Sequence, residues 1–201
     1  IEPTSGEIRT GGGTAAEARQ NNRLSFFFQE DVLLPWRSVM QNVLLPLELQ
    51  GEDTDDPEVR TQAKEVTETV GLKGSADRKP QQLSGGMRQG VALVRAFVYD
   101  PELFLMAEPV AALDELTRRK MNNELLRIHQ EIRKTTVFVT HHIAEAVWLS
   151  DRVVVLSPQP GEVYDIVDID LSRPRDEDTR SHDAFVEYEE SLTETVMELD
   201  V

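Results

Sequence analysis

Cysteine is absent from the 201-residue sequence, so neither a disulfide framework nor a thiolate metal site is possible. No apolar run approaches the length that crosses a bilayer. The first residues also lack the basic and apolar stretches of a secretory signal. These absences favour a reducing, cytoplasmic compartment. A starting methionine is missing too, which predicts that the sequence is part of a longer protein, or a processed or incomplete one.

Basic residues are scarce. Lys and Arg number 21 against 37 Asp and Glu, which gives a formal net charge of −16. A phosphate backbone needs a basic binding face, so the charge argues against nucleic acid as the main partner. The acidic excess is typical of an ordinary solvated surface or of a protein adapted to a salt-rich cytoplasm, and the sequence leaves both interpretations open.

The hydrophobic pattern predicts alternating strands and helices, and therefore an α/β protein with a largely parallel sheet. Apolar runs predict strands over residues 24–28, 104–106, 136–140 and 153–156, with edge hairpin strands over 162–171. Helices are expected in two stretches within 38–72, after residue 84, and over 116–132, 143–149 and 183–200. Asp56-Pro57 is a typical helix start and Gly71 a typical stop. Residues 11–14 are interpreted as a turn.

A glycine-rich turn opens one predicted helix, at Ser84-Gly85-Gly86-Met87. The start of a helix carries unpaired N–H donors and the positive end of the dipole, glycine lets an oxyanion approach the backbone, and the Ser hydroxyl adds a donor. The turn therefore predicts an anion site. Taken alone, it is equally typical of an ordinary helix start that contains glycine.

A buried apolar strand, residues 103–107, ends in the carboxylate of Glu108. Phosphoryl-transfer enzymes place a base or a metal partner in this way at the edge of a sheet, so Glu108 is a candidate general base. The structural alternative is an acid at the start of a helix, where the dipole favours it.

Three more polar residues follow predicted strands or precede a predicted helix. His141 ends a strand, at the position where open α/β sheets bind ligands. Gln29 follows a strand and could orient water or touch a metal ion. Asp114 precedes a helix and is also a good N-cap.

Together, these segments resemble the ATP-binding subunits of ABC transporters. The matching segments are, in chain order, a Q-loop (28–36, closely that of the nitrate, sulfonate and taurine branch), a signature motif with its helix (81–96), a Walker B strand (103–109), a D-loop (111–114) and an H-loop (139–146). The resemblance implies a P-loop NTPase-like parallel core with an α-helical subdomain.

The resemblance also implies roles for the site residues. Glu108 would polarise the attacking water, His141 would contact the terminal phosphate, and Gln29 would serve catalysis and the Mg²⁺ ion. The residues that would bind ATP are Ser84, Gly85, Gly86, Met87 and Asp114. The implied cofactors are ATP and Mg²⁺.

The sequence departs from the family pattern in several places. No phosphate loop of the form G-x-x-x-x-G-K-[ST] occurs, so the resemblance runs from residue 1 to about 172 with the first strand and phosphate loop missing. Ala107 stands where the family has the Asp that holds Mg²⁺, Gly90 where Arg is common, and His142 where Asp usually follows the His. We expect the 201 residues alone to bind ATP weakly and to be inactive.

The resemblance predicts four parts of the chain. Residues 1–29 would be an incomplete part of the ATPase core, 30–97 the Q-loop and helical subdomain with the signature motif, 98–172 the rest of the core, and 173–201 a helical tail.

The implied function is ATP-driven import of a small anion such as nitrate, a sulfonate or taurine. The partners would be a second ATP-binding subunit (the same or a different chain), transmembrane permease subunits and, indirectly, an extracytoplasmic solute-binding protein, with no nucleic acid. The chain would lie on the cytoplasmic side of the cell membrane. One alternative is a degenerate subunit without hydrolysis that acts structurally or in trans. Another is a non-transport ABC ATPase that acts on DNA or the ribosome, which the acidic charge and the absence of long insertions disfavour.

Overall fold

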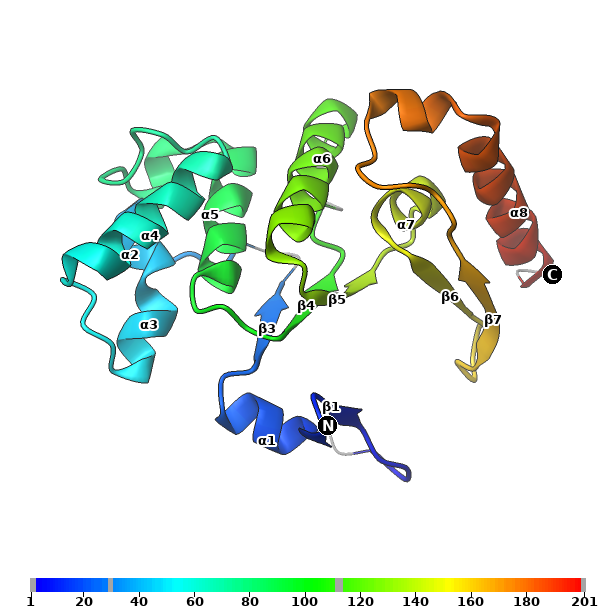
Figure 1. The fold of residues 1–201 in the computed structure, drawn as a ribbon, viewed down its shortest axis with the longest axis horizontal. Helices are drawn as coiled ribbons and strands as arrows, with labels where there is room; N and C mark the ends of the chain where they lie inside the picture. The colour runs from blue at the N-terminus through cyan, green and yellow to red at the C-terminus, as the bar shows by residue number, and fades with distance from the viewer. Residues whose placement is uncertain (1–2, 29–30, 111–113, 200–201) are drawn as a thin grey trace. The chain divides into compact units, whose positions relative to one another are not determined.

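The structure is a computed structural model that describes residues 3–28, 31–110 and 114–199. The chain divides into two compact units. Unit 1 comprises residues 1–117 and 134–137, and unit 2 comprises residues 118–133 and 138–201. The first unit carries the glycine-rich turn and the second carries the C-terminal part of the chain (Figure 1).

The main sheet has three strands in the order β3-β4-β5. Strands β3 (Leu24–Phe27) and β4 (Leu103–Ala107) are parallel, as the alternating pattern predicted, and Leu24 pairs with Leu103. Strand β5 spans Thr135–Val139. Phe104 of β4 is buried, and its ring lies 4.0 Å from that of Phe97 in helix α5, which fixes the helix against the sheet.

A small N-terminal hairpin and helix precede this sheet. Strands β1 (Arg9–Thr10) and β2 (Gly13–Thr14) pair antiparallel, and helix α1 (Ala15–Gln20) follows directly. The interpretation of residues 11–14 as a turn alone was incomplete, because Thr14 also caps α1. Its hydroxyl accepts from the N–H of Glu17, and the Glu17 carboxylate accepts from the N–H of Thr14, a capping box.

Five helices form a cluster within unit 1 (Figure 1). They are α2 (Val39–Val43), α3 (Leu45–Gln50), α4 (Pro57–Thr69), the 3₁₀ helix η1 (Pro80–Gln82) and α5 (Gly85–Phe97). Two helical stretches were predicted within 38–72. The structure has three helices there, because the chain bends between α2 and α3. Helix α4 starts after the Asp56 cap, and Gly71 adopts φ +76°, which confirms both signals. The core of this cluster contains Val39, Val43, Ala63, Leu72, Val91 and Val94.

Unit 2 contains most of α6 (Glu115–Ile132), helix α7 (Ile143–Leu149), strands β6 (Arg152–Leu156) and β7 (Val163–Asp168), the 3₁₀ helix η2 (Glu177–Ser181) and α8 (Asp183–Leu199). Its core surrounds Trp148, which is 1% exposed and contacts Phe185 edge to face. The predicted apolar side of the last helix is confirmed, because Phe185, Leu192, Val196 and Leu199 all pack in this core.

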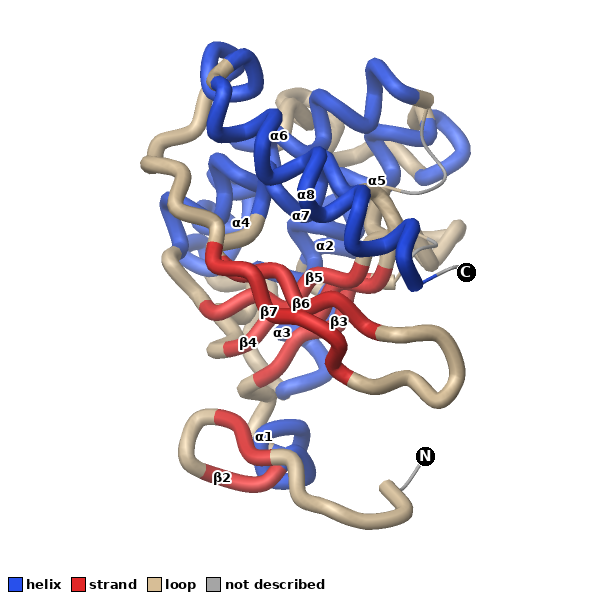
Figure 2. Tube along the Cα trace, turned by 90° about the vertical axis from the view of Figure 1, so that its right-hand side faces the viewer, coloured by secondary structure: helices blue, strands red, loops and turns tan. Residues whose placement is uncertain are grey.

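One face of the β6–β7 hairpin is apolar and uncovered within its unit. The two strands lie side by side (Figure 2) and run antiparallel, and the register places Val154 opposite Ile166. Val154, Leu156, Tyr164 and Ile166 are 48%, 62%, 52% and 54% exposed, whereas Val155, which points the other way, is buried. Both faces of strand β6 are therefore apolar. Such a continuous apolar sequence is typical of strands that are covered on both faces, whereas here one face is exposed.

Candidate functional site

The glycine-rich turn forms the first turn of helix α5. Ser84 is the N-cap, and its hydroxyl oxygen accepts from the N–H of Met87 at 3.3 Å. Gly85 and Gly86 follow at the first helical positions, where the N–H groups have no partner within the helix. Because Ser84 is exposed, the turn presents backbone donors and the positive helix end to solvent. This is the geometry of an oxyanion site.

Gly86 lies close to the first turn of α6. A Cβ atom built on Gly86 would be 3.2 Å from Cγ2 of Thr117. Asp114 caps the same turn, because its carboxylate accepts from the N–H of Thr117 at 3.1 Å. Hydrogen bonds from the Thr117 side chain and backbone hold the pKa of Asp114 below its ordinary value. The predicted N-cap is confirmed. The other D-loop residues, Ala111 to Leu113, lie outside the described residues.

The carboxyl end of β4 carries Ala107 and Glu108. Both side chains are half-buried. Glu108 has φ +47°, a left-handed conformation that a non-glycine residue adopts at some cost in free energy. It follows the strand in a bend rather than at a helix start, so the alternative of a helix N-terminal acid does not hold for Glu108. Its role as a general base stays a prediction.

The donors for a magnesium ion are incomplete in the described part of the chain. Within it, no three His, Asp or Glu side chains are grouped as a metal site, and the methyl group of Ala107 cannot act as a ligand. The described residues therefore do not by themselves provide the ligands of a Mg²⁺ site. Gln29, the predicted metal and catalytic contact, lies outside the described residues.

His141 belongs to unit 2, whereas Ser84, Glu108 and Asp114 belong to unit 1, so its surroundings are described separately. Its ring centroid lies 4.1 Å from that of His142, which precedes α7. The Thr140 hydroxyl accepts from the N–H of His142 at 3.0 Å and donates to buried Glu145 at 2.8 Å. This network orders the turn that presents His141.

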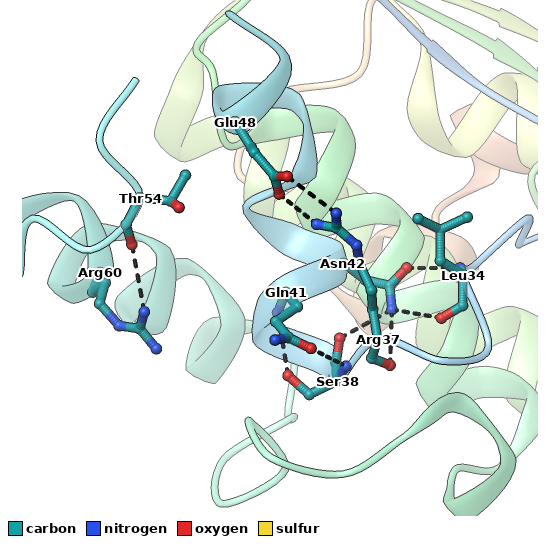
Figure 3. A network of polar contacts seen from close by, with 8 residues as sticks. All are labelled: Leu34, Arg37, Ser38, Gln41, Asn42, Glu48, Thr54 and Arg60. Atoms are coloured by element: carbon teal, nitrogen blue, oxygen red, sulfur yellow. Dashed lines mark hydrogen bonds and ion pairs between the residues drawn. The ribbon is translucent and has the colours of Figure 1, made fainter. Parts of the chain in front are cut away.

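A buried amide that the sequence did not single out organises the loop after the predicted Q-loop glutamine. Asn42, which is fully buried in α2, accepts from the N–H of Leu34 at 2.8 Å and donates to the carbonyls of Leu34, Arg37 and Ser38 (Figure 3). The local signal was the Ser38…Gln41 capping box, which places Asn42 one residue further on in the helix. Its partners on the loop could not be read from the sequence.

The same loop borders a hollow of about 540 Å³. Met40 and Leu44 contribute apolar surface, and Trp36 at its edge is 67% exposed. The charged groups come in pairs, Arg37 with Glu48 and Arg60 with Asp55. Figure 3 shows Arg37, from the loop before α2, paired with Glu48 of α3, and Thr54 and Arg60 from the following segment. None of the described helices has the length and hydropathy of a membrane span.

Comparison with known proteins matches residues 1–111 to the sequence family described as ABC transporter. The chain is 50% identical over 166 residues to the uncharacterized ABC transporter ATP-binding protein MJ0412 of Methanocaldococcus jannaschii, covering 82% of this chain and 60% of that protein. It is 41% identical to the nitrate import ATP-binding protein NrtC of Synechococcus elongatus, over 87% of this chain and 26% of that protein.

A third relative is the aliphatic sulfonates import ATP-binding protein SsuB of Bacillus licheniformis, 41% identical over 75% of this chain and 57% of its own length. The chain thus spans less than two thirds of these relatives. The ATP-binding cassette MJ0796, solved as a dimer in a post-hydrolysis state bound to ADP and Pi, superposes with a TM-score of 0.70 at 32% identity. The match covers 84% of this chain and 75% of that one.

Proposed function

Because the chain belongs to the ABC transporter family and has the fold of its ATP-binding domains, we propose that it is the ATP-binding subunit of an importer. It would couple ATP hydrolysis to the uptake of a small anion such as nitrate, a sulfonate or taurine. Relatives named for nitrate and for aliphatic sulfonates support this substrate class.

The observation that carries the proposal is the capped turn at the start of α5. Ser84 and the two glycines offer backbone and hydroxyl donors at a positive helix end, which is the chemistry that binds a phosphate oxyanion. The 201 residues contain no phosphate loop, so these donors would complete a nucleotide site whose other half lies on another polypeptide segment. In a dimer, that segment would belong to the second subunit.

The hollow beside Trp36 is the surface on which we propose that a permease subunit docks. It combines apolar side chains with paired charges at its edge, as a protein interface does. The exposed indole of Trp36 would be the main apolar contact, because aromatic residues dominate such contacts.

A degenerate subunit without hydrolysis remains the second candidate. One observation favours it: position 107 holds Ala, and no metal-binding group is found among residues 3–28, 31–110 and 114–199. Such a subunit would still offer the Ser84 turn in trans to a partner that hydrolyses ATP.

The test is ATP hydrolysis by this chain fused behind an upstream segment that carries a phosphate loop. Ala107→Asp should raise kcat by about tenfold, equivalent to roughly 1.4 kcal/mol, because it restores a carboxylate for Mg²⁺. Ser84→Asp should lower ATP affinity and rate, because it places a negative charge against the phosphate. Asp is itself a good N-cap, so this variant keeps α5 stable.

The unfused 201-residue chain is the control, and calorimetry should detect only weak binding of Mg-ATP. If Ser84→Asp leaves hydrolysis by the fusion unchanged, the turn does not bind the phosphate and the proposal is wrong. If Ala107→Asp has no effect while Ser84→Asp does, position 107 is not on the metal side of the site.

A further inference from the structure

His142 is one of the positions where the sequence departs from the family pattern, since Asp usually follows His141 there. In the structure it is the N-cap residue of α7, with φ −96° and ψ 110°, and its side chain makes no capping hydrogen bond. Its carbonyl accepts from the N–H groups of Glu145 and Ala146, each at 3.1 Å. The backbone of His142 therefore closes the first turn of α7, and its ring is available for another contact.

The ring of His142 lies against the ring of His141. Their centroids are 4.1 Å apart and their planes are inclined by 39°. Successive side chains of an extended strand point to opposite sides, so neighbouring rings can meet only where the backbone turns. Residue 141 lies in such a bend, between the end of β5 and the start of α7. Aromatic rings in offset or inclined contact attract one another beyond the apolar area that they bury.

The two rings differ in how freely they can move. His141 is exposed, whereas His142 is half-buried. An exposed side chain exchanges between staggered rotamers, and holding it in one of them costs conformational entropy. The ring of His142 covers one side of the His141 imidazole, so it restricts the orientations that this imidazole can adopt.

A buried carboxylate fixes the backbone that carries the His142 ring. The N–H of His142 donates to the Thr140 hydroxyl at 3.0 Å, and this hydroxyl donates to Glu145 at 2.8 Å. Glu145 is 5% exposed, and its other carboxylate oxygen lies 3.7 Å from Nε of Arg118 in α6. All these residues belong to unit 2. A change of the His142 side chain therefore leaves the groups that anchor its backbone in place.

We infer that His142 is a positioning residue, whose ring holds the imidazole of His141 in one orientation. This inference rests on the proposed function, because that orientation affects hydrolysis only if His141 contacts the terminal phosphate of ATP, as predicted. A group that acts on a bound phosphate must be held near its productive position, since a displacement of about 1 Å can cost roughly 100-fold in rate. The stacked ring supplies this orientation before the nucleotide binds.

The first test measures the ring contact in the 201-residue chain without nucleotide. The chain has four histidines, so their ring signals in a proton–carbon NMR spectrum can be assigned by substitution. In the parent chain, we expect a nuclear Overhauser contact between the rings of His141 and His142 and an upfield shift of the His141 ring protons. His142→Ala and His142→Asp should remove that shift, whereas His142→Phe should keep it, because a phenyl ring also stacks.

Two of these variants separate orientation from folding. Aspartate is among the best N-cap residues, so His142→Asp should unfold at the same urea concentration as the parent chain or a higher one, although it loses the stack. His142→Phe adds no capping group and should be no more stable than the parent, although it keeps the stack. A merely structural role of residue 142 would make the aspartate variant the more active of the two.

The second test measures ATP hydrolysis by the fusion that carries a phosphate loop. His142→Ala and His142→Asp should lower kcat by about tenfold and leave the KM for ATP within about twofold, since a loosely held imidazole reduces the fraction of bound complexes that react. His142→Phe should rescue kcat to within about twofold of the parent. His182→Ala is the matched control. His182 stands before α8 as His142 stands before α7, with a carbonyl that accepts from two N–H groups of the first turn, and its loss should leave kcat unchanged.

Equal His141 ring shifts in His142→Ala and in the parent chain would overturn the inference, because the ring of residue 142 would not be holding its neighbour. So would a fall in kcat that His142→Phe does not rescue, or one that His182→Ala reproduces. A fusion that hydrolyses no ATP, while the ring signals respond as expected, would contradict the proposed function and still support the orientation of His141 by His142.

Discussion

Gly90 lies in the interior of α5, at a position where a longer side chain is common in the family. The helix leaves room for a methyl group, because a Cβ atom would meet Leu72 at 3.5 Å and Val70 at 3.8 Å, which are ordinary van der Waals distances. Glycine in a helix interior costs about 1 kcal/mol relative to alanine.

We therefore expect Gly90→Ala to raise the free energy of unfolding by about 1 kcal/mol, measured by urea denaturation. Gly86→Ala is the comparison, because its Cβ would press on Thr117 at 3.2 Å and the gain in helix propensity would be offset. A Gly90→Ala chain that is no more stable than the parent would show that the contact with Leu72 is tighter than the structure indicates.

For single residues, the sequence predicted the roles that depend on near neighbours in the chain. The helix start at Ser84, the cap at Asp114 and the stop at Gly71 each depend on neighbours within a few positions, and all three are found. The bond between Asp31 and Arg88 joins residues 57 positions apart, and no local pattern encodes it. The same holds for the bonds of Asn42 to the loop.

Among the elements, the C-terminal segment is held by one buried cation. The side chain of Arg175 is 0% exposed, and it donates to the carbonyls of Val147, Trp148, Ser150 and Leu171. Desolvation, and then the neighbouring Arg173, lower its pKa to about 10. Arg175 is therefore still protonated at neutral pH, and its stabilising hydrogen bonds persist there. The cost of burying its charge is therefore present at neutral pH and falls only as the pH rises above about 10.

Replacing Arg175 by Met should lower the free energy of unfolding by about 3 kcal/mol, because four carbonyls lose their donor in a buried setting. The buried indole of Trp148 offers a fluorescence readout of this transition. Arg152→Met is the control, since exposed Arg152 pairs with Asp168 at the surface and should change stability by less than about 0.5 kcal/mol. Equal losses in the two variants would argue against the anchoring role of Arg175.

Long periodic elements were the most predictable. Helices α7 and α8 and strands β3 to β6 were expected within one residue of their observed bounds, because hydrophobic spacing defines them. The edge hairpin strands expected over 162–171 are instead the single strand β7, which pairs with β6. Helix α1 was overlooked although Thr14 and Glu17 have capping-box spacing, since six residues carry little periodicity. The break between α2 and α3 falls at Pro46, in the first turn of α3, because proline has no N–H to continue the helix and disfavours helical geometry at the residue before it.

For the whole molecule, the dominant property is the charge of −16. Helix α8 concentrates it: Glu190, Glu194 and Glu198 follow at i, i+4 spacing, and the helix has no basic residue in its last turn. Like charges at this spacing destabilise a helix, and an acid near its C-terminus opposes the dipole. Added salt screens such repulsion, because the Debye length falls from about 10 Å at 0.1 M to about 3 Å at 1 M.

The unfolding temperature should therefore rise by several degrees between 0.05 M and 1 M KCl. Glu194→Lys should raise it by about 2–4 °C at low salt, because two repulsions become attractions, and by much less at 1 M. Glu52→Lys in an exposed loop changes the net charge equally without i, i+4 partners, so it should have the smaller effect. The same gain from both variants would place the effect in the net charge rather than in α8.

The net charge has a second consequence, because the apolar face of β6–β7 is uncovered: it affects how readily copies of the chain associate in solution. Val154, Leu156, Tyr164 and Ile166 form a surface on which two copies of the chain could adhere. Mutual repulsion of two strongly anionic molecules raises the barrier to that encounter. Salt that strengthens the fold removes this barrier, so the conditions under which one copy is most stable are those under which many copies are most prone to cluster.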